Sequence, residues 1–151
     1  MPRKKKTTEP MMAVVVVTHG KAADAMVVTA RAILGNIPAL TAVSVRMDET
    51  FDTLVDRISE ACEGVDEGGG VLILVDIHGS SPFNAAMAML DGTRPAEVLC
   101  GVNLPMLVKL ATMNRRLTSP SVMAEDLRDA GRRSIRLGTE LTGKVSVTEK
   151  R

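Results

Sequence analysis

The chain has 151 residues and a formal net charge of +1, with 45% hydrophobic and 25% charged residues. This length suits a single domain with one core, and the ordinary balance of apolar and charged residues excludes a disordered chain and a membrane-embedded one. The near-zero charge and the lack of Trp and Tyr argue against a nucleic-acid binder, because such proteins use a basic surface and stacking aromatic rings.

The first half of the chain predicts two strands that each lead into a helix. Four consecutive valines, residues 14–17, indicate a central parallel strand, because both of its faces are apolar. The second strand alternates apolar and polar side chains, which is typical of an edge strand. Thr50 is expected to cap the second helix with its hydroxyl group. The expected bounds are a strand at 13–18, a helix at 22–34, a strand at 40–46 and a helix at 50–63.

The second half continues the alternation of strands and helices. Ser81-Pro82 opens a helix as a cap and first-turn proline pair, and Ser119-Pro120 opens the last helix. That last helix is expected to place apolar residues from Met123 to Leu141 on or near one face. The expected bounds are a strand at 71–76, a helix at 81–90, a strand at 97–101, a short helix at 105–113 and a last helix at 119–141.

This order of elements predicts an α/β fold with a doubly wound, mostly parallel sheet of strand order 2-1-3-4 and helices on both faces. One domain is expected at residues 12–143. Residues 1–11 are expected to form a disordered basic tail without a secretion signal. Residues 144–151 alternate weakly and form either an extra antiparallel edge strand or a tail.

The two cysteines, Cys62 and Cys100, have no metal-ligand spacing. We therefore expect buried free thiols in a reducing, cytoplasmic compartment and no metal site.

Two predicted strands end on side chains that carry chemistry. The first ends on His19, with Gly20 behind it, and the third ends on Asp76. In the order 2-1-3-4 these strands are neighbours, roughly 5 Å apart, and ligands bind where their helices leave on opposite faces. Asp76 can then hold one ring nitrogen of His19 protonated and leave the lone pair of the other nitrogen free as a nucleophile.

The loop after Asp76 suits a phosphate group. Backbone amides around Ser80 and Ser81 lie at the positive end of a helix dipole. Gly79 lets the backbone approach an anion closely, and Asn103, just beyond the fourth strand, can add an amide donor.

Each of these residues also has a purely structural interpretation. His19 and His78 can be solvated loop residues, and Asp76 can cap a turn. Serines such as Ser80 and Ser81 commonly cap helices. Lys21 can supply positive potential or be an ordinary surface charge.

Four motifs together resemble the enzyme IIA component of the mannose (mannose/fructose/sorbose) family of the bacterial phosphoenolpyruvate-dependent sugar phosphotransferase system. They occur in the family's order over about residues 13–111, and the rest of the chain resembles the family only loosely. The motifs are Val-Thr-His-Gly at 17–20, Leu-Val-Asp at 74–76, Ser-Pro-Phe-Asn-Ala-Ala at 81–86 and Gly-Val-Asn-Leu-Pro-Met-Leu at 101–107.

The resemblance implies that His19 accepts a phosphoryl group from the phosphocarrier protein HPr and passes it to a IIB protein. Asp76 would orient the ring, and Ser81 would line the site. IIB then phosphorylates the sugar at the membrane permease, so contact with the membrane is indirect. The resemblance also implies a homodimer, formed partly by exchange of a C-terminal edge strand, and no metal or organic cofactor.

The chain departs from the family pattern at residues 78–80, where His-Gly-Ser replaces two glycines before the Ser-Pro. This loop is therefore expected to differ in geometry or partner specificity. No linker and fused IIB domain follow, so we expect IIB on a separate chain, and a regulatory role without transport stays open.

Other functions stay open as alternatives. The phosphotransfer subunit of dihydroxyacetone kinase shares the histidine of the first strand. A hydrolase could use Ser81, His19 and Asp76 as a triad, but the chain has no Gly-x-Ser-x-Gly elbow. A regulatory binding module would use the same crevice without covalent chemistry.

Overall fold

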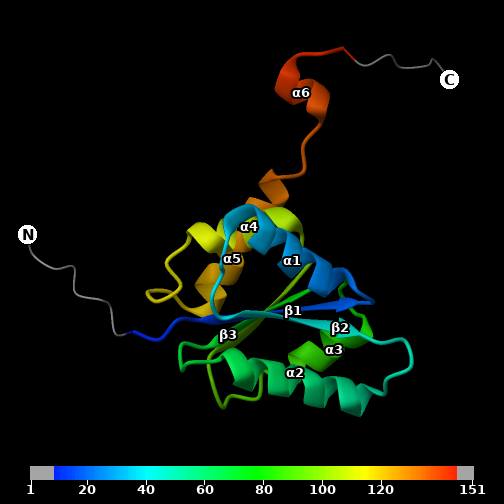
Figure 1. Cartoon of the computed structure of the whole chain (residues 1–151), viewed down its shortest axis with the longest axis vertical. Coiled ribbons are helices and arrows are strands. Elements are labelled where there is room, and N and C mark those ends of the chain that lie inside the picture. Colours follow the sequence, from blue (N-terminus) through cyan, green and yellow to red (C-terminus); the bar gives the residue numbers. More distant parts are fainter. Residues whose placement is uncertain (1–8, 146–151) are drawn as a thin grey trace, which may run out of the picture.

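A parallel sheet of strand order β2-β1-β3-β4 forms the centre of the computed structural model, which describes residues 9–145 (Figure 1). The predicted α/β fold and strand order are confirmed. The elements are, in chain order, β1 (Ala13–His19), α1 (Ala22–Leu34), β2 (Leu40–Val45), α2 (Phe51–Val65), β3 (Val71–Val75), α3 (Ser81–Met87), β4 (Ala96–Cys100), α4 (Leu104–Thr112), α5 (Pro120–Arg133) and α6 (Gly138–Thr142).

The four valines of β1 explain why this strand is central. Val14 and Val16 point into a core formed with α1, α4 and α5, whereas Val15 and Val17 point into a second core formed with α2 and α3. Successive side chains of a strand face opposite sides, so only a strand covered on both faces can bury all four. Figure 1 shows the two layers of helices above and below the sheet.

The crossovers open a crevice at the carboxyl ends of β1 and β3. These strands pair in parallel, with Val17 opposite Val75, and β2 pairs on the other side of β1, with His19 opposite Val45. Helix α1 follows β1 onto one face, and α3 follows β3 onto the other. The segments that follow β1 and β3 therefore leave toward opposite faces of the sheet, just beyond the strand ends that carry the candidate residues.

A buried arginine holds the opposite, amino end of the sheet. Arg115 is 4% exposed, and its guanidinium donates hydrogen bonds to the carbonyl oxygens of Met12 (2.9 Å), Ala39 (3.2 Å) and Pro38. Ala39 adopts a φ of +50°, a strained value for a residue with a side chain. Burial lowers the pKa of Arg115, but all the acceptors around it are backbone carbonyls that favour the charged form.

The predicted last helix is wrong beyond residue 133, because α5 ends there and the short helix α6 follows separately. Met123 and Leu127 pack into the core as predicted, but Ile135 is 80% exposed and Leu141 is 57% exposed. A helix without a face to bury gains little stability from further turns. The segment from residue 134 therefore leaves the body, as the orange and red ribbon of Figure 1 shows.

Three smaller predictions need correction. The helix expected at residues 81–90 ends at Met87, because its last turn tightens through hydrogen bonds from Met89 N to Ala86 O and from Leu90 N to Met87 O. Its cap is Ser80, one residue earlier than expected. Cys62 is buried, but Cys100 is only half-buried because β4 is an edge strand.

Parts of the predicted tails lie outside the described residues. The basic run of the tail at residues 1–11 falls on residues 1–8, and the strand or tail at 144–151 falls mostly on residues 146–151. Lys144 and Val145 follow α6 without regular structure. Between residues 9 and 145 no helix is both long and apolar enough to cross a membrane.

Candidate functional site

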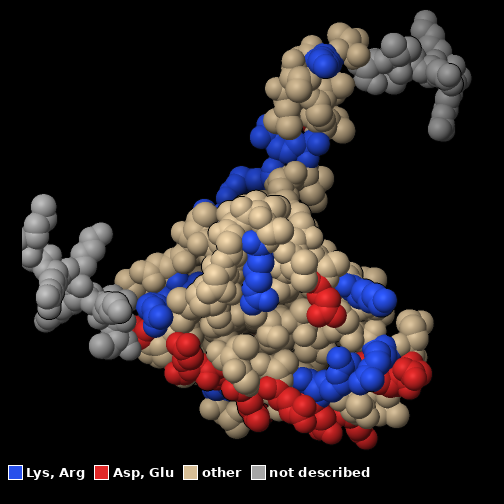
Figure 2. Space-filling model, in the orientation of Figure 1, with Lys and Arg blue, Asp and Glu red and all other residues tan. Residues whose placement is uncertain are grey.

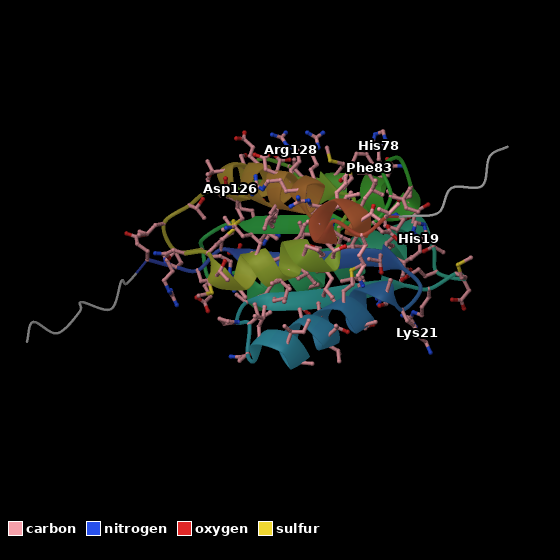
Figure 3. The ribbon with its side chains drawn as sticks, turned by 90° about the horizontal axis from the view of Figure 1, so that it is seen from above. His19, Lys21, His78, Phe83, Asp126 and Arg128 are labelled. Carbon is pink, nitrogen blue, oxygen red and sulfur yellow. The ribbon has the colours of Figure 1, made fainter. Side chains whose placement is uncertain are left out.

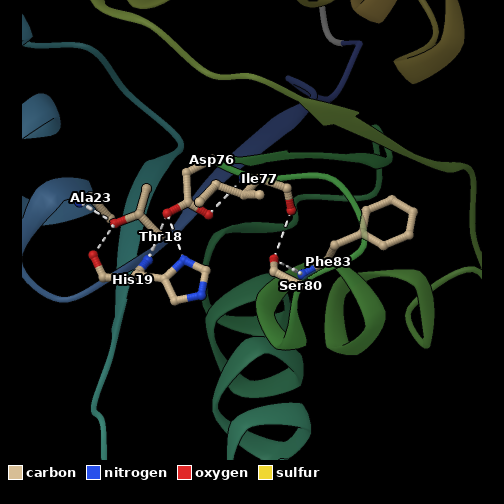
Figure 4. Close-up of polar contacts among 7 residues, drawn as sticks. All are labelled: Thr18, His19, Ala23, Asp76, Ile77, Ser80 and Phe83. Carbon is tan, nitrogen blue, oxygen red and sulfur yellow. Dashed lines mark hydrogen bonds and ion pairs between the residues drawn. The ribbon is translucent and has the colours of Figure 1, made fainter.

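Asp76 and His19 meet at the carboxyl end of the sheet, as the topology predicts (Figure 4). The Oδ2 atom of Asp76 lies 2.8 Å from His19 Nδ1 and accepts a second hydrogen bond from the His19 backbone amide at 2.9 Å. The Oδ1 atom accepts the amide of Ile77 at 2.9 Å. Three donors therefore hold this carboxylate in one orientation.

Asp76 is ionised at neutral pH. Partial burial raises its pKa, but the hydrogen bonds from the amide and ring of His19 and from the amide of Ile77 outweigh this effect and leave the pKa below its usual value. An ionised carboxylate only accepts hydrogen bonds, so Nδ1 of His19 must carry a proton. In the neutral form of the ring the lone pair therefore lies on Nε2, and the side chain is 43% exposed.

Thr18 fixes the turn that carries His19, a role that the sequence analysis missed. Its hydroxyl is buried and accepts a hydrogen bond from the backbone amide of Ala23 at 2.6 Å, which joins the end of β1 to the first turn of α1. Gly20 takes a φ of +55° and donates its amide to Val45 O of the neighbouring strand at 3.0 Å. The only signal in the sequence is a hydroxyl at the end of an otherwise apolar strand.

The loop between Asp76 and α3 is organised by Ser80. Its hydroxyl donates to Ile77 O at 2.7 Å and accepts the amide of Phe83 at 3.4 Å, which makes it the N-cap. Gly79 has a φ of +76°, a conformation that favours glycine. The His78 ring packs edge-on against Phe83, with ring centroids 5.1 Å apart. Ser81 is the first residue of α3 and is not its capping residue.

A cavity of about 210 Å³ adjoins His19. Ser81 and Pro82 of α3 form one wall, and the turn from β2 into α2 forms the other. The lining residues are His19, Val45, Arg46, Met47, Glu49, Thr50, Phe51, Leu54, Ser81 and Pro82. Ser81 and His19 thus line the same cavity. The sequence analysis missed the wall from β2, because nothing in residues 46–51 marks them as neighbours of His19.

The remaining predicted residues lie around this site rather than in the cavity. The Oδ1 atom of Asn103 caps α4 by accepting the Met106 amide at 3.1 Å, and Asn103 borders a different depression, beside Gly131. Lys21 is exposed and has no capping contact at the start of α1. Figure 3 shows Lys21 and His78 at the same end of the molecule as His19. Nowhere in residues 9–145 do three His, Cys, Asp or Glu side chains gather as a metal site would require.

Comparison with protein families matches residues 13–126 to the model described as "PTS system fructose IIA component". The mannose-specific EIIAB component of Escherichia coli (strain K12) is 37% identical over 110 residues, which cover 73% of this chain and 33% of that protein. The fructose-specific EIIA component of Bacillus subtilis (strain 168) is 28% identical over 135 residues, which cover 89% of this chain and 92% of that protein. The match thus spans about a third of the mannose-specific relative's length.

Solved structures share the fold. The EIIA component from Streptococcus agalactiae superposes with a TM-score of 0.78 at 17% identity, covering 86% of this chain and 99% of that one. The mannose/sorbose IIA subunit from Enterococcus faecalis gives a TM-score of 0.74 at 20% identity, covering 93% and 99%. The resemblance identified from the four motifs is therefore confirmed, and this chain belongs to the mannose and fructose family of phosphotransferase system IIA components.

Proposed function

We propose that the chain is a phosphoryl carrier of the sugar phosphotransferase system. In this proposal Nε2 of His19 accepts a phosphoryl group from phospho-HPr and passes it to a IIB protein. The hydrogen bond between Nδ1 and Asp76 is the observation that carries the proposal, because it directs the free lone pair to the exposed nitrogen. The family membership adds support from independent relatives.

The transfer needs no proton movement at His19. The bond between phosphorus and the donor's ring nitrogen breaks as the bond from Nε2 to phosphorus forms, while the Nδ1 proton stays in its hydrogen bond. The His19 ring becomes positively charged, and the carboxylate of Asp76 stabilises that charge. The reverse step is equally available, as a carrier that hands the group on requires.

The phosphoryl oxygens need donors from the other side of the cavity. We assign this role to the hydroxyl and amide of Ser81, which lines the cavity, and to the backbone at Gly79 and Ser80, which directly precede Ser81. Asn103 stays a prediction: its oxygen caps α4, which leaves its Nδ2 as the donor that could contribute.

The chain is further proposed to act as a homodimer in the cytoplasm. Among residues 9–145 no strand covers the outer edge of β4, and an unpaired edge is a ready template for a strand from a second copy. The C-terminal segment, which leaves the body after α5, could supply that strand. Two free cysteines suit a reducing compartment.

Intact-mass measurement after incubation with phosphoenolpyruvate, enzyme I and HPr tests the proposal. We expect one phosphoryl group on the wild-type chain, lost on acid treatment, and none on His19→Ala. Labelling that persists in His19→Ala would place the acceptor elsewhere, and a wild-type chain that takes no label would refute the carrier function.

A further inference from the structure

The wall of the cavity opposite Ser81 contains a buried carboxylate that the transfer mechanism does not use. Glu49 lies in the turn between β2 and α2, and its side chain is only 5% exposed. The same turn follows Val45, the residue paired with His19 across the sheet. Glu49 and His19 therefore line one cavity from two neighbouring strands.

The two oxygens of Glu49 have different surroundings. Oε1 accepts hydrogen bonds from Arg57 Nη1 at 2.6 Å and from the Arg46 backbone amide at 2.8 Å. Oε2 is buried and has no hydrogen-bond partner within residues 9–145. Buried polar atoms are nearly always paired, so Oε2 is an acceptor that no protein donor within residues 9–145 uses.

Glu49 is not protonated at neutral pH, so Oε2 stays a hydrogen-bond acceptor. Burial raises its pKa, but the hydrogen bonds from the Arg46 amide and the Arg57 side chain, together with the charges of both arginines, hold the pKa below its usual value. The carboxylate therefore stays ionised at neutral pH. An ionised oxygen is satisfied best by a charged N–H donor.

The cavity is large enough for the end of a long side chain. Its volume of about 210 Å³ is many times the roughly 10–15 Å³ that one water molecule needs by the same measure. Met47 is 93% exposed and Phe51 is 49% exposed, so the rim is apolar and can pack against the methylene stem of a lysine or arginine. Oε2 itself is buried, so a donor reaches it only if Glu49 or its neighbours shift when the partner binds.

The surface beside the cavity also favours a cationic partner. Helix α2 starts at the cavity and exposes a stripe of acidic residues along its outer side. Figure 2 shows red side chains along the lower edge of the molecule, where α2 lies in Figure 1. The stripe consists of Asp52, Asp56, Glu60 and Glu63. Such a field attracts a basic protein surface and orients it during encounter.

We propose that this cavity receives a lysine or arginine side chain of the protein that exchanges a phosphoryl group with His19, and that Oε2 of Glu49 accepts its hydrogen bond. This inference rests on the proposed carrier function. The incoming cation would lie between the carboxylate and the transferring group, where it neutralises charge on the phosphoryl oxygens. Glu49 would then select the partner by charge without touching the phosphorus.

Glu49→Gln tests the proposal with little change in shape. The amide keeps an oxygen for the bonds from Arg46 and Arg57 but places an N–H₂ group where the partner's cation should bind. We expect the second-order rate constant for transfer from phospho-HPr to fall about tenfold or more, the loss typical of one charge-assisted hydrogen bond. Phosphorylation by the small donor phosphoramidate should stay unchanged, because it brings no side chain.

The matched control is Glu67→Gln, an exposed glutamate in the loop before β3, which should leave both rates unchanged. Each lysine and arginine of HPr should also be replaced in turn, and the transfer rate measured with wild type and with Glu49→Gln. We expect one of these replacements to slow transfer to the wild-type chain but not to Glu49→Gln. A Glu49→Gln rate equal to wild type, or the absence of any such coupled residue, would overturn the inference. A wild-type chain that takes no label from phospho-HPr would instead refute the carrier function itself.

Discussion

Each end of the sheet holds a charged side chain that forms hydrogen bonds with several backbone groups, but only one end leaves an exposed atom available for reaction. At the amino end, Arg115 is buried and directs its guanidinium at three carbonyl oxygens. At the carboxyl end, Asp76 takes the amides of His19 and Ile77 and the ring Nδ1, while Nε2 of the same ring stays free. The charge of Arg115 holds backbone segments together, whereas the charge of Asp76 orients a ring whose second nitrogen stays available for chemistry.

The largest effect on stability is expected from Arg115→Met. The substitution removes the donor of three carbonyl groups, which lie at the start of β1 and in the loop before β2. We expect the free energy of unfolding to fall by about 3 kcal/mol, since a single unsatisfied buried group costs roughly 1–3 kcal/mol. Chemical denaturation measures this loss. Below the unfolding transition, the rate of His19 phosphorylation should stay close to that of wild type.

The neighbouring substitution Arg116→Met is the control, because Arg116 donates to a single carbonyl, that of Glu9, near the surface. Its effect should stay within about 1 kcal/mol. Equal losses for the two variants would mean that the carbonyl cluster around Arg115 is not special. If folded Arg115→Met protein were no longer phosphorylated, the claim that Arg115 serves stability alone would be wrong.

A smaller effect on stability, but a large one on rate, is expected from Asp76→Asn. The amide removes the negative charge that stabilises the ring, and it can donate to Nδ1, so the proton is no longer held there. We expect phosphorylation of His19 to slow roughly tenfold to a hundredfold, the range given by about 1.5–3 kcal/mol for a hydrogen bond to a charged group. Rapid-quench measurements with phospho-HPr give this rate.

Asp91→Asn provides the matched comparison, because the carboxylate of Asp91 also accepts a backbone amide, that of Thr93, in the loop before β4. This variant should transfer at the wild-type rate. If Asp76→Asn were equally fast, the orientation of the His19 ring would not depend on the carboxylate.

The fold and the central pair could be predicted because both follow from local patterns and topology. The valine run of β1 requires cover on both faces, and the alternation of strands and helices leaves few sheet orders. That order alone makes His19 and Asp76 neighbours. Side-chain identity at two strand tips was therefore enough to predict their contact.

The missed features depend on contacts between distant segments. Arginine is usually exposed, so nothing in the sequence marks Arg115 as buried against residues 12 and 39. Glu49 has the pattern of an ordinary residue before a helix, and its burial depends on Arg57, two helix turns beyond the cap. The apolar pattern continues past α5 to Leu141, but the core does not extend that far.

Nitrogen NMR of the His19 ring, before and after phosphorylation, tests most directly the claim that Asp76 selects the reacting atom. In the neutral, unphosphorylated ring, we expect Nδ1 to carry the proton and Nε2 to have the chemical shift of an unprotonated nitrogen. After incubation with phosphoenolpyruvate, enzyme I and HPr, the phosphoryl group should be bonded to Nε2. A proton on Nε2 with Nδ1 unprotonated, or a phosphoryl group on Nδ1, would contradict the account.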